Sequence, residues 1–209
     1  MTAAEWLGCE DARKMVEWLR GLASDRKLRL FACAFWRWHE KAAGTDSEIA
    51  SEMLQALDYA EQWAERGSRP AVRFPTGFGW HPLVARNAID AANWTIRQTA
   101  GFKARRDYLR ADARCGTQAA EQQISLLREI VGNPFCPVAV DPAWLVWNDG
   151  TMPKVAQAIY DERTFDRLPI LADALEEAGC NDGVILSHCR QPGEHVRGCW
   201  VVDLMLGRA

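Results

Sequence analysis

The sequence lacks any run of 18 uncharged apolar residues, so no transmembrane helix is expected. Its first six residues, Met1 to Trp6, also lack the basic region and the apolar stretch of a signal peptide. The seven cysteines are an odd number without regular spacing, which argues against a disulfide framework. Together these absences predict a cytoplasmic protein with reduced thiols and no contact with a membrane.

Motifs of well-known enzymes are missing as well. The chain has no Gly-rich phosphate loop, no His-Glu-x-x-His helix and no Gly-x-Ser-x-Gly elbow. The formal net charge of −3, from 25 Lys+Arg and 28 Asp+Glu, argues against a general polyanion binder. Our main hypothesis is therefore a module without catalytic activity or cofactor, such as an adaptor, that binds another protein.

Helix signals dominate the local sequence. Thr2–Glu5 and Thr45–Glu48 both fit the capping box, in which a hydroxyl and a Glu carboxylate satisfy free amides at a helix start. No alternating apolar pattern is bounded by hairpin dipeptides, so strands are not expected. We predict an all-α fold of about eight to ten helices, arranged as an orthogonal bundle or as stacked helical hairpins.

Glycine and proline residues that interrupt helices divide the chain into three regions, which we expect to form one compact domain. Residues 1–66 predict three amphipathic helices: one carrying Met15, Leu19 and Leu22 on one face, one from about Asp25 to Gly44, and one ending at Gly67. Residues 67–82 hold three prolines and three glycines and predict a long loop or boundary. Residues 83–209 predict a C-terminal helical region, irregular from Pro134 to Asp149, with a capped helix after Thr151 and helices at Leu168–Leu175, Asp182–Arg190 and His195–Leu206.

Aromatic residues in the two irregular segments are candidates for binding a partner. The chain has ten tryptophans, and tryptophan is enriched in binding hot spots. The candidate residues are Phe74, Phe78, Trp80, Trp144 and Trp147. The alternative is that these loops fold back and that their rings fill the core.

A cluster of metal-capable residues near the C-terminus supports a second hypothesis, a zinc-stabilised helical domain. The candidate ligands are Cys180, His188, His195 and Cys199. On a helix, His195 and Cys199 would project from one face because they are four positions apart. The same cysteines and histidines are the candidates for a third hypothesis, a Cys-His enzyme, and the alternative to both is that they fill the helical core.

One basic stretch makes nucleic acid a candidate partner in the zinc hypothesis. Its residues are Arg97, Lys103, Arg105, Arg106, Tyr108, Arg110 and Arg114. Residues 46–65 carry six acidic side chains and no basic one. Pairing between basic and acidic segments within the fold, or across a homo-oligomer, is the alternative use of these charges.

Two parts of the chain resemble a known family. Ala23–Cys33 is one of them, and the more specific one comprises Arg167–Cys180, His188–Arg190 and His195–Asp203. These segments are similar to a family of uncharacterised paralogous proteins from planctomycete-type bacteria. The resemblance implies a helical protein and brings no activity with it.

Overall fold

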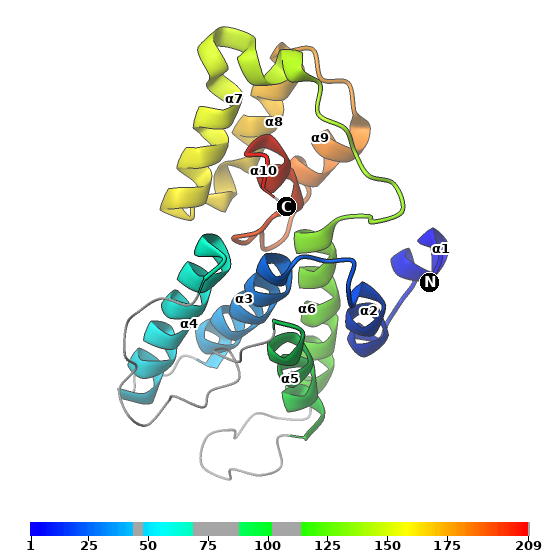
Figure 1. Ribbon diagram of the computed structural model, residues 1–209, viewed down its shortest axis with the longest axis vertical. Helices are drawn as coiled ribbons and strands as arrows, with labels where there is room; N and C mark the ends of the chain where they lie inside the picture. Colours follow the sequence, from blue (N-terminus) through cyan, green and yellow to red (C-terminus); the bar gives the residue numbers. More distant parts are fainter. Residues whose placement is uncertain (44–47, 69–87, 102–113, 209) are drawn as a thin grey trace. The chain divides into compact units, whose positions relative to one another are not determined.

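The computed structural model describes residues 1–43, 48–68, 88–101 and 114–208. The described residues form ten α-helices and one short 3-10 helix, and no strand (Figure 1). The predicted all-α class with about eight to ten helices is confirmed. None of the described helices combines the length and the apolar character that crossing a membrane requires.

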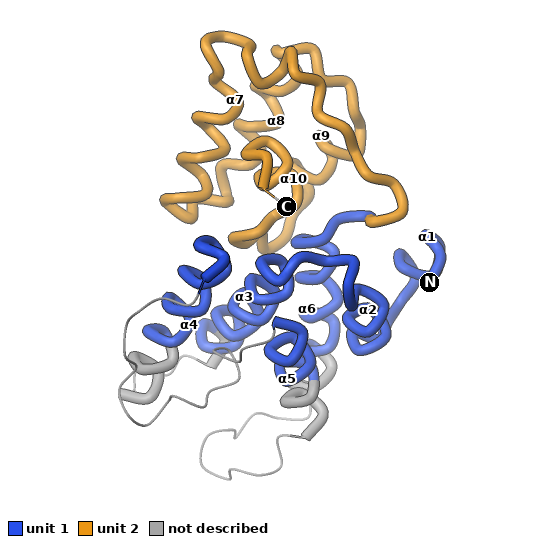
Figure 2. Tube along the Cα trace, in the orientation of Figure 1, with its two compact units in different colours: residues 1–133 blue, residues 134–209 orange. Residues whose placement is uncertain are grey.

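The chain divides into two compact units, Met1–Asn133 and Pro134–Ala209 (Figure 2). The division follows Gly132, whose φ of 71° is a left-handed conformation that suits glycine, and precedes Pro134. The sequence instead suggested a boundary within residues 67–82 and a single compact domain. Most of that segment, residues 69–82, lies outside the described residues.

Unit 1 is organised around one long helix. Its helices are α1 (Ala3–Leu7), α2 (Ala12–Leu19), α3 (Asp25–Ala43), α4 (Glu48–Arg66), α5 (Ala88–Gly101) and α6 (Arg114–Val131). Helix α3 packs against α4, α5 and α6 and buries Leu30, Phe31 and Phe35 completely. The predicted helices from Asp25 to Gly44 and up to Gly67 are present as α3 and α4.

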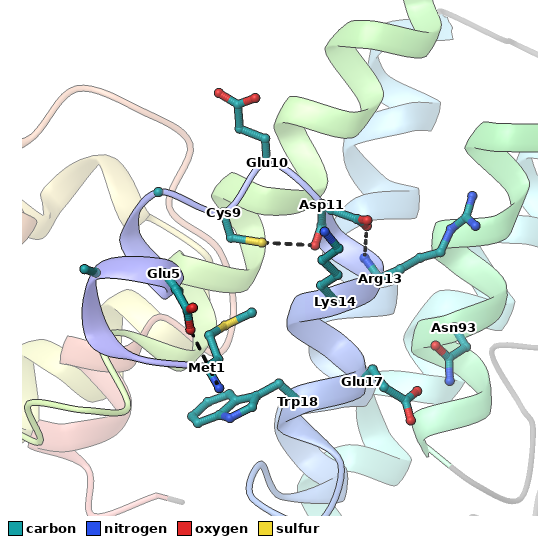
Figure 3. A pocket seen from close by; sticks show the side chains of 12 residues that line it. Met1, Glu5, Cys9, Glu10, Asp11, Arg13, Lys14, Glu17, Trp18 and Asn93 are labelled. Carbon is teal, nitrogen blue, oxygen red and sulfur yellow. Dashed lines mark hydrogen bonds and ion pairs between the residues drawn. The ribbon is translucent and has the colours of Figure 1, made fainter.

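The first predicted helix is in fact two helices, which corrects the sequence analysis. The predicted Thr2 capping box starts α1: the Glu5 amide donates to the Thr2 hydroxyl at 3.2 Å, and the Thr2 amide donates to the Glu5 carboxylate at 2.7 Å. The chain leaves α1 at Gly8, and Asp11 caps α2 by accepting the Arg13 amide at 2.9 Å (Figure 3). The apolar stripe that begins at Met15 therefore belongs to α2 and not to the helix that starts after Thr2.

Helix α2 also ends before Leu22, contrary to the prediction. Its last residue is Leu19, and Gly21 has a φ of 77°, a left-handed conformation outside right-handed helical geometry. Leu22 is therefore 63% exposed, whereas Met15 and Leu19 are buried as expected. The second predicted capping box, at Thr45, involves residues 44–47, which lie outside the described residues.

Helix α1 and the residues directly after it are held to α6 by hydrogen bonds to their backbone carbonyl groups. The Arg128 guanidinium donates to the carbonyls of Trp6, Leu7 and Cys9 at 3.1, 2.7 and 3.0 Å. The Trp6 indole, itself fully buried, donates to the Gly132 carbonyl at 3.1 Å. These bonds satisfy the polar groups that the end of a helix leaves unpaired.

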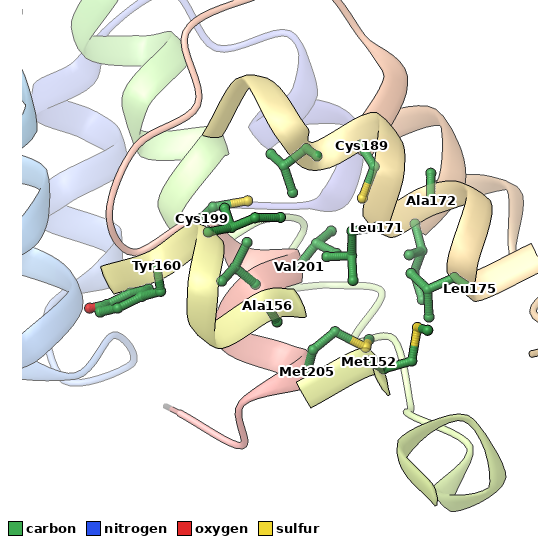
Figure 4. Packing of buried hydrophobic residues seen from close by; sticks show 14 of the residues in the cluster. Met152, Ala156, Tyr160, Leu171, Ala172, Leu175, Cys189, Cys199, Val201 and Met205 are labelled. Atoms are coloured by element: carbon green, nitrogen blue, oxygen red, sulfur yellow. The ribbon is translucent and has the colours of Figure 1, made fainter. Parts of the chain in front are cut away.

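Unit 2 has its own hydrophobic core. Its elements are α7 (Pro142–Glu162), the 3-10 helix η2 (Phe165–Arg167), α8 (Leu168–Glu177), α9 (Gly183–Arg190) and α10 (Trp200–Met205). Apolar side chains from all four α-helices meet in this core, including Met152, Leu171, Leu175, Val201 and Met205 (Figure 4). The predicted helices at Leu168–Leu175 and Asp182–Arg190 correspond to α8 and α9.

Helix α7 begins inside the segment that the sequence analysis expected to be irregular. The Asp141 carboxylate accepts the Ala143 amide at 2.8 Å, and Pro142 occupies the first turn, where it needs no hydrogen-bond partner. Residues 147–150 then leave helical geometry, with positive φ angles at residues 148–150. The hydroxyl of Thr151 donates to the Asn148 carbonyl at 2.6 Å instead of capping the helix that follows.

Candidate functional site

The structure brings three of the four predicted metal ligands together in unit 2. The ligand atoms of His188, His195 and Cys199 all lie within 4.8 Å of one another. Nε2 of His188 is 3.3 Å from Sγ of Cys199, and the two histidine ring centroids are 5.0 Å apart. His188 and Cys199 are buried, and His195 is half-buried.

Helix α9 positions His188 in its last turn. The helix starts because the Asp182 carboxylate accepts the amides of Val184 and Ile185 at 2.8 and 3.2 Å. At its other end, Arg190 donates two hydrogen bonds to the Glu176 carboxylate of α8, at 2.9 and 2.6 Å. The helix that carries His188 is thus capped at its start and tied to α8 at its end.

A turn, and not a helix, positions His195 and Cys199, which corrects the sequence analysis. Helix α10 begins only at Trp200, and the chain before it contains Gly193 and Gly198 with φ angles of 155° and 95°. The Cys199 amide donates to the Val196 carbonyl at 2.9 Å and closes the turn. The predicted His195–Leu206 helix is therefore shorter than expected: only Trp200–Met205 is helical, because Gly198 has a left-handed φ.

The His188 ring has defined neighbours on both of its nitrogen atoms. Nδ1 is 3.2 Å from Nε2 of the Gln191 side chain, and Nε2 faces Cys199. The Trp200 ring lies beside the imidazole, with a centroid distance of 5.0 Å. These contacts fix the plane of the imidazole, so its Nε2 atom points at the cysteine sulfur.

The fourth predicted ligand, Cys180, does not belong to this group. It follows the left-handed Gly179 at the end of α8 and is 4% exposed, as part of the apolar core of unit 2. Burial, with a smaller contribution from the charges of Asp182 and Glu176, raises the pKa of its thiol above the ordinary value. The Cys180 side chain is thus a core thiol, as the alternative interpretation proposed for these cysteines.

The pair of His188 and Cys199 also has the spacing that a Cys-His nucleophile needs. Cys199 is 0% exposed, and its side chain packs with Val201 and other residues of the unit 2 core (Figure 4). A nucleophile must meet its substrate, which this burial prevents in the observed conformation. The burial therefore argues against nucleophilic chemistry for this thiol and suits either a metal ligand or a core thiol.

The aromatic partner-binding candidates fall into two groups. Trp144 is 9% exposed and belongs to the hydrophobic core of unit 2, and Trp147 is partly buried against the same core. Both rings are thus used mainly within the fold. Phe74, Phe78 and Trp80 lie outside the described residues.

Most of the basic stretch also lies outside the described residues. This applies to Lys103, Arg105, Arg106, Tyr108 and Arg110. Arg97 lies in α5 and Arg114 is the first residue of α6.

A groove in unit 1 is a candidate site that the sequence analysis missed. It has a volume of about 1320 Å³ and is bordered by α1, the connection to α2, α2 itself and Asn93 of α5 (Figure 3). Its charged lining consists of Glu5, Glu10, Asp11, Arg13, Lys14 and Glu17. No motif marks these residues, because they come together only through the unpredicted break between α1 and α2.

Three of the groove's charged side chains are available for a ligand. Within the described part of unit 1, the side chains of Glu10, Arg13 and Lys14 are exposed and take part in no hydrogen bond or ion pair. Glu17 pairs with Arg20 at 3.3 Å, with both side chains more than half exposed. The half-buried Trp18 forms an aromatic wall and packs against Trp6 with tilted ring planes and a centroid distance of 5.8 Å.

Comparison of the chain with protein-family models, with curated proteins and with solved structures finds no match in any of the three.

Proposed function

We propose that this protein is a non-catalytic interaction module that binds a basic segment of another protein in the groove between α1 and α2. The groove carries the proposal: its lining has four carboxylates against two cationic side chains, beside the Trp18 ring. Acidic grooves attract Lys- and Arg-rich chains, and tryptophan is a frequent anchor in protein interfaces. The predicted partner is thus a segment with net positive charge and at least one apolar residue.

The size of the groove supports a polypeptide ligand. Sites for small molecules typically measure about 300–1,000 Å³ and are mainly apolar. This groove has a volume of about 1320 Å³, and six of its twelve lining residues are charged. Among the described residues that line it there is no histidine, the usual acid–base group of an active site.

Nucleic acid is a poorer fit to this surface. Phosphate contacts dominate the affinity of nucleic-acid binding and need cationic side chains that are not offset by acids. Glu10 and Glu17 would repel a phosphate backbone in the groove. The alternative that residues 97–114 contact nucleic acid concerns a different surface and stays a prediction.

The proposal can be tested by selecting a random peptide library on the purified protein. We expect the selected peptides to be rich in Lys and Arg and to contain an aromatic or aliphatic residue. The double variant Glu10→Lys/Glu17→Lys should bind these peptides at least about tenfold more weakly, and the difference should shrink as salt is raised. Fluorescence anisotropy of labelled peptides measures both effects.

The matched control is Asp166→Lys/Glu177→Lys, which changes the net charge by the same amount at two exposed positions of unit 2. It should leave peptide affinity within about twofold of the wild-type value, apart from the general effect of charge. Peptides that bind the groove variant as tightly as the wild type would reject the groove as the binding surface. A labelled oligonucleotide that binds both variants equally would favour the nucleic-acid alternative.

A further inference from the structure

Unit 2 contains a compact group of nitrogen and sulfur donors that the proposed peptide groove does not involve. His188 comes from α9, while His195 and Cys199 come from the turn before α10. Their ligand atoms lie within 4.8 Å of one another, and Nε2 of His188 is 3.3 Å from Sγ of Cys199. Two imidazoles and a thiol are the ligand types of zinc sites.

The distances are close to those of a bound zinc ion. Zinc lies about 2.0–2.3 Å from nitrogen and sulfur ligands, which places tetrahedral ligands about 3.5 Å from one another. The observed upper limit of 4.8 Å requires movements of about 1 Å, within the range of side-chain rotation in a turn. The 3.3 Å pair already has the required separation.

Gln191 provides the support that a ligating histidine usually has. A zinc-bound imidazole normally donates its second N–H to a nearby acceptor, which fixes the ring. The Gln191 side-chain amide lies 3.2 Å from Nδ1 of His188, and a half-turn of this exposed amide presents its oxygen as the acceptor. The lone pair of Nε2 then faces Sγ of Cys199, where an ion would bind.

We propose that unit 2 binds one zinc ion through Nε2 of His188, the imidazole of His195 and Sγ of Cys199. Binding converts the Cys199 thiol to a thiolate, which forms the sulfur–zinc bond and releases one proton to the solvent. Three protein ligands leave a fourth position for water or another donor. The ion would connect α9 to the turn before α10 and thereby stabilise unit 2.

The test is a titration of the chelator-treated full chain with cobalt(II), a spectroscopic substitute for zinc. We expect one equivalent to bind with visible bands of tetrahedral cobalt and a near-ultraviolet thiolate-to-cobalt band, and we expect zinc to displace it. Cys199→Ser should remove the thiolate band, and His188→Gln or His195→Gln should weaken binding at least about tenfold. Cys180→Ser, which changes another buried thiol outside the group, should retain both the stoichiometry and the thiolate band.

A second measurement uses only the wild-type protein, so it tests the proposal even if the variants fail to fold. Zinc at saturating concentration should raise the melting temperature of the wild-type protein, and a chelator should reverse the rise. A thiolate band that is absent from the wild type, or that survives Cys199→Ser, would overturn the proposal, as would a melting temperature that zinc leaves unchanged. Since the groove lies in unit 1, either proposal can fail without the other.

Discussion

Nε2 of His188 lies 3.3 Å from Sγ of Cys199, although the two residues are eleven positions apart in the chain. Helix α9 ends at Arg190, and the chain then reverses through Gly193 and Gly198 before α10 begins. The contact therefore depends on backbone conformations that favour glycine. This dependence leads to the first of four predictions.

Replacing Gly198 with Ala should destabilise the protein by about 1–2 kcal/mol, because an added Cβ disfavours a positive φ. Gly198 has a φ of 95° and lies directly before Cys199 in the chain. Urea unfolding measures the loss, and the cobalt titration should show weaker binding by the same variant. Gly183→Ala is the control: it lies in the first turn of α9 with nothing within 4 Å of the added Cβ, and it should be neutral or slightly stabilising. Equal losses in the two variants would contradict the argument.

Replacing Leu171 with Ala should cost about 2–5 kcal/mol of unfolding free energy, because it leaves a cavity in the core of unit 2. Leu171 is completely buried there. Its neighbour Ile170 is 57% exposed on the same helix, so Ile170→Ala should cost less than about 1 kcal/mol. Thermal or urea unfolding measures the stability of both variants. Similar losses of unfolding free energy would mean that α8 is packed differently.

The pairing of Arg190 with Glu176 should make stability depend on acidic pH. Hydrogen bonds from Arg190, together with its charge, hold the pKa of Glu176 below its ordinary value of 4.5. A carboxyl whose pKa is lower in the folded state contributes stability that is fully present above the unfolded value and is lost as pH falls through the folded value. The wild-type protein should therefore lose this contribution below about pH 4.5.

The variant Arg190→Gln removes the cause of the lowered pKa and should flatten this part of the pH profile. Glu176→Gln, which has no carboxyl to titrate, should flatten it in the same way. Urea midpoints measured between pH 7 and pH 3 test both variants. A profile of Arg190→Gln that runs parallel to that of the wild type would contradict the assignment.

A fragment comprising residues 134–209 should fold by itself. All 17 buried residues of the unit 2 core, from Trp144 to Met205, belong to this segment. The fragment should show a helical circular-dichroism spectrum and a cooperative thermal transition. An unfolded fragment would show that unit 2 depends on the rest of the chain, as the expectation of a single domain implied.

The sequence alone predicted those helices whose signals lie within a few residues of each other. The Thr2 capping box, the helix that starts at about Asp25 and the helix between Asp182 and Arg190 were all predicted and are all present. Each relies on contacts across three or four positions, which a sequence displays directly. The all-α class follows from the same local signals.

The errors arose where short signals compete. The Thr2 capping box and the apolar residues 15–22 suggested one long helix. In the structure, α1 ends at Gly8 and a second helix, α2, starts after Asp11. Helix α2 then ends before Gly21, so Leu22 is exposed. Near the C-terminus, the spacing of His195 and Cys199 suggested a shared helix face. The left-handed Gly198 makes this segment a turn, so the two residues meet for a different reason than the spacing indicated.

Composition alone identified the histidines and cysteines of unit 2 as candidates but could not separate Cys199 from Cys180. Both are buried cysteines, and only the path of the chain between α9 and α10 places Cys199 beside His188. The same applies to the groove of unit 1, since Glu10 and Trp18 share a surface only because α1 and α2 are separate helices. The sequence thus determined the helices and the residue types of the candidate sites, because both follow from neighbours in the chain. Tertiary structure decided which of those residues share a site, because their proximity depends on turns and packing between distant segments.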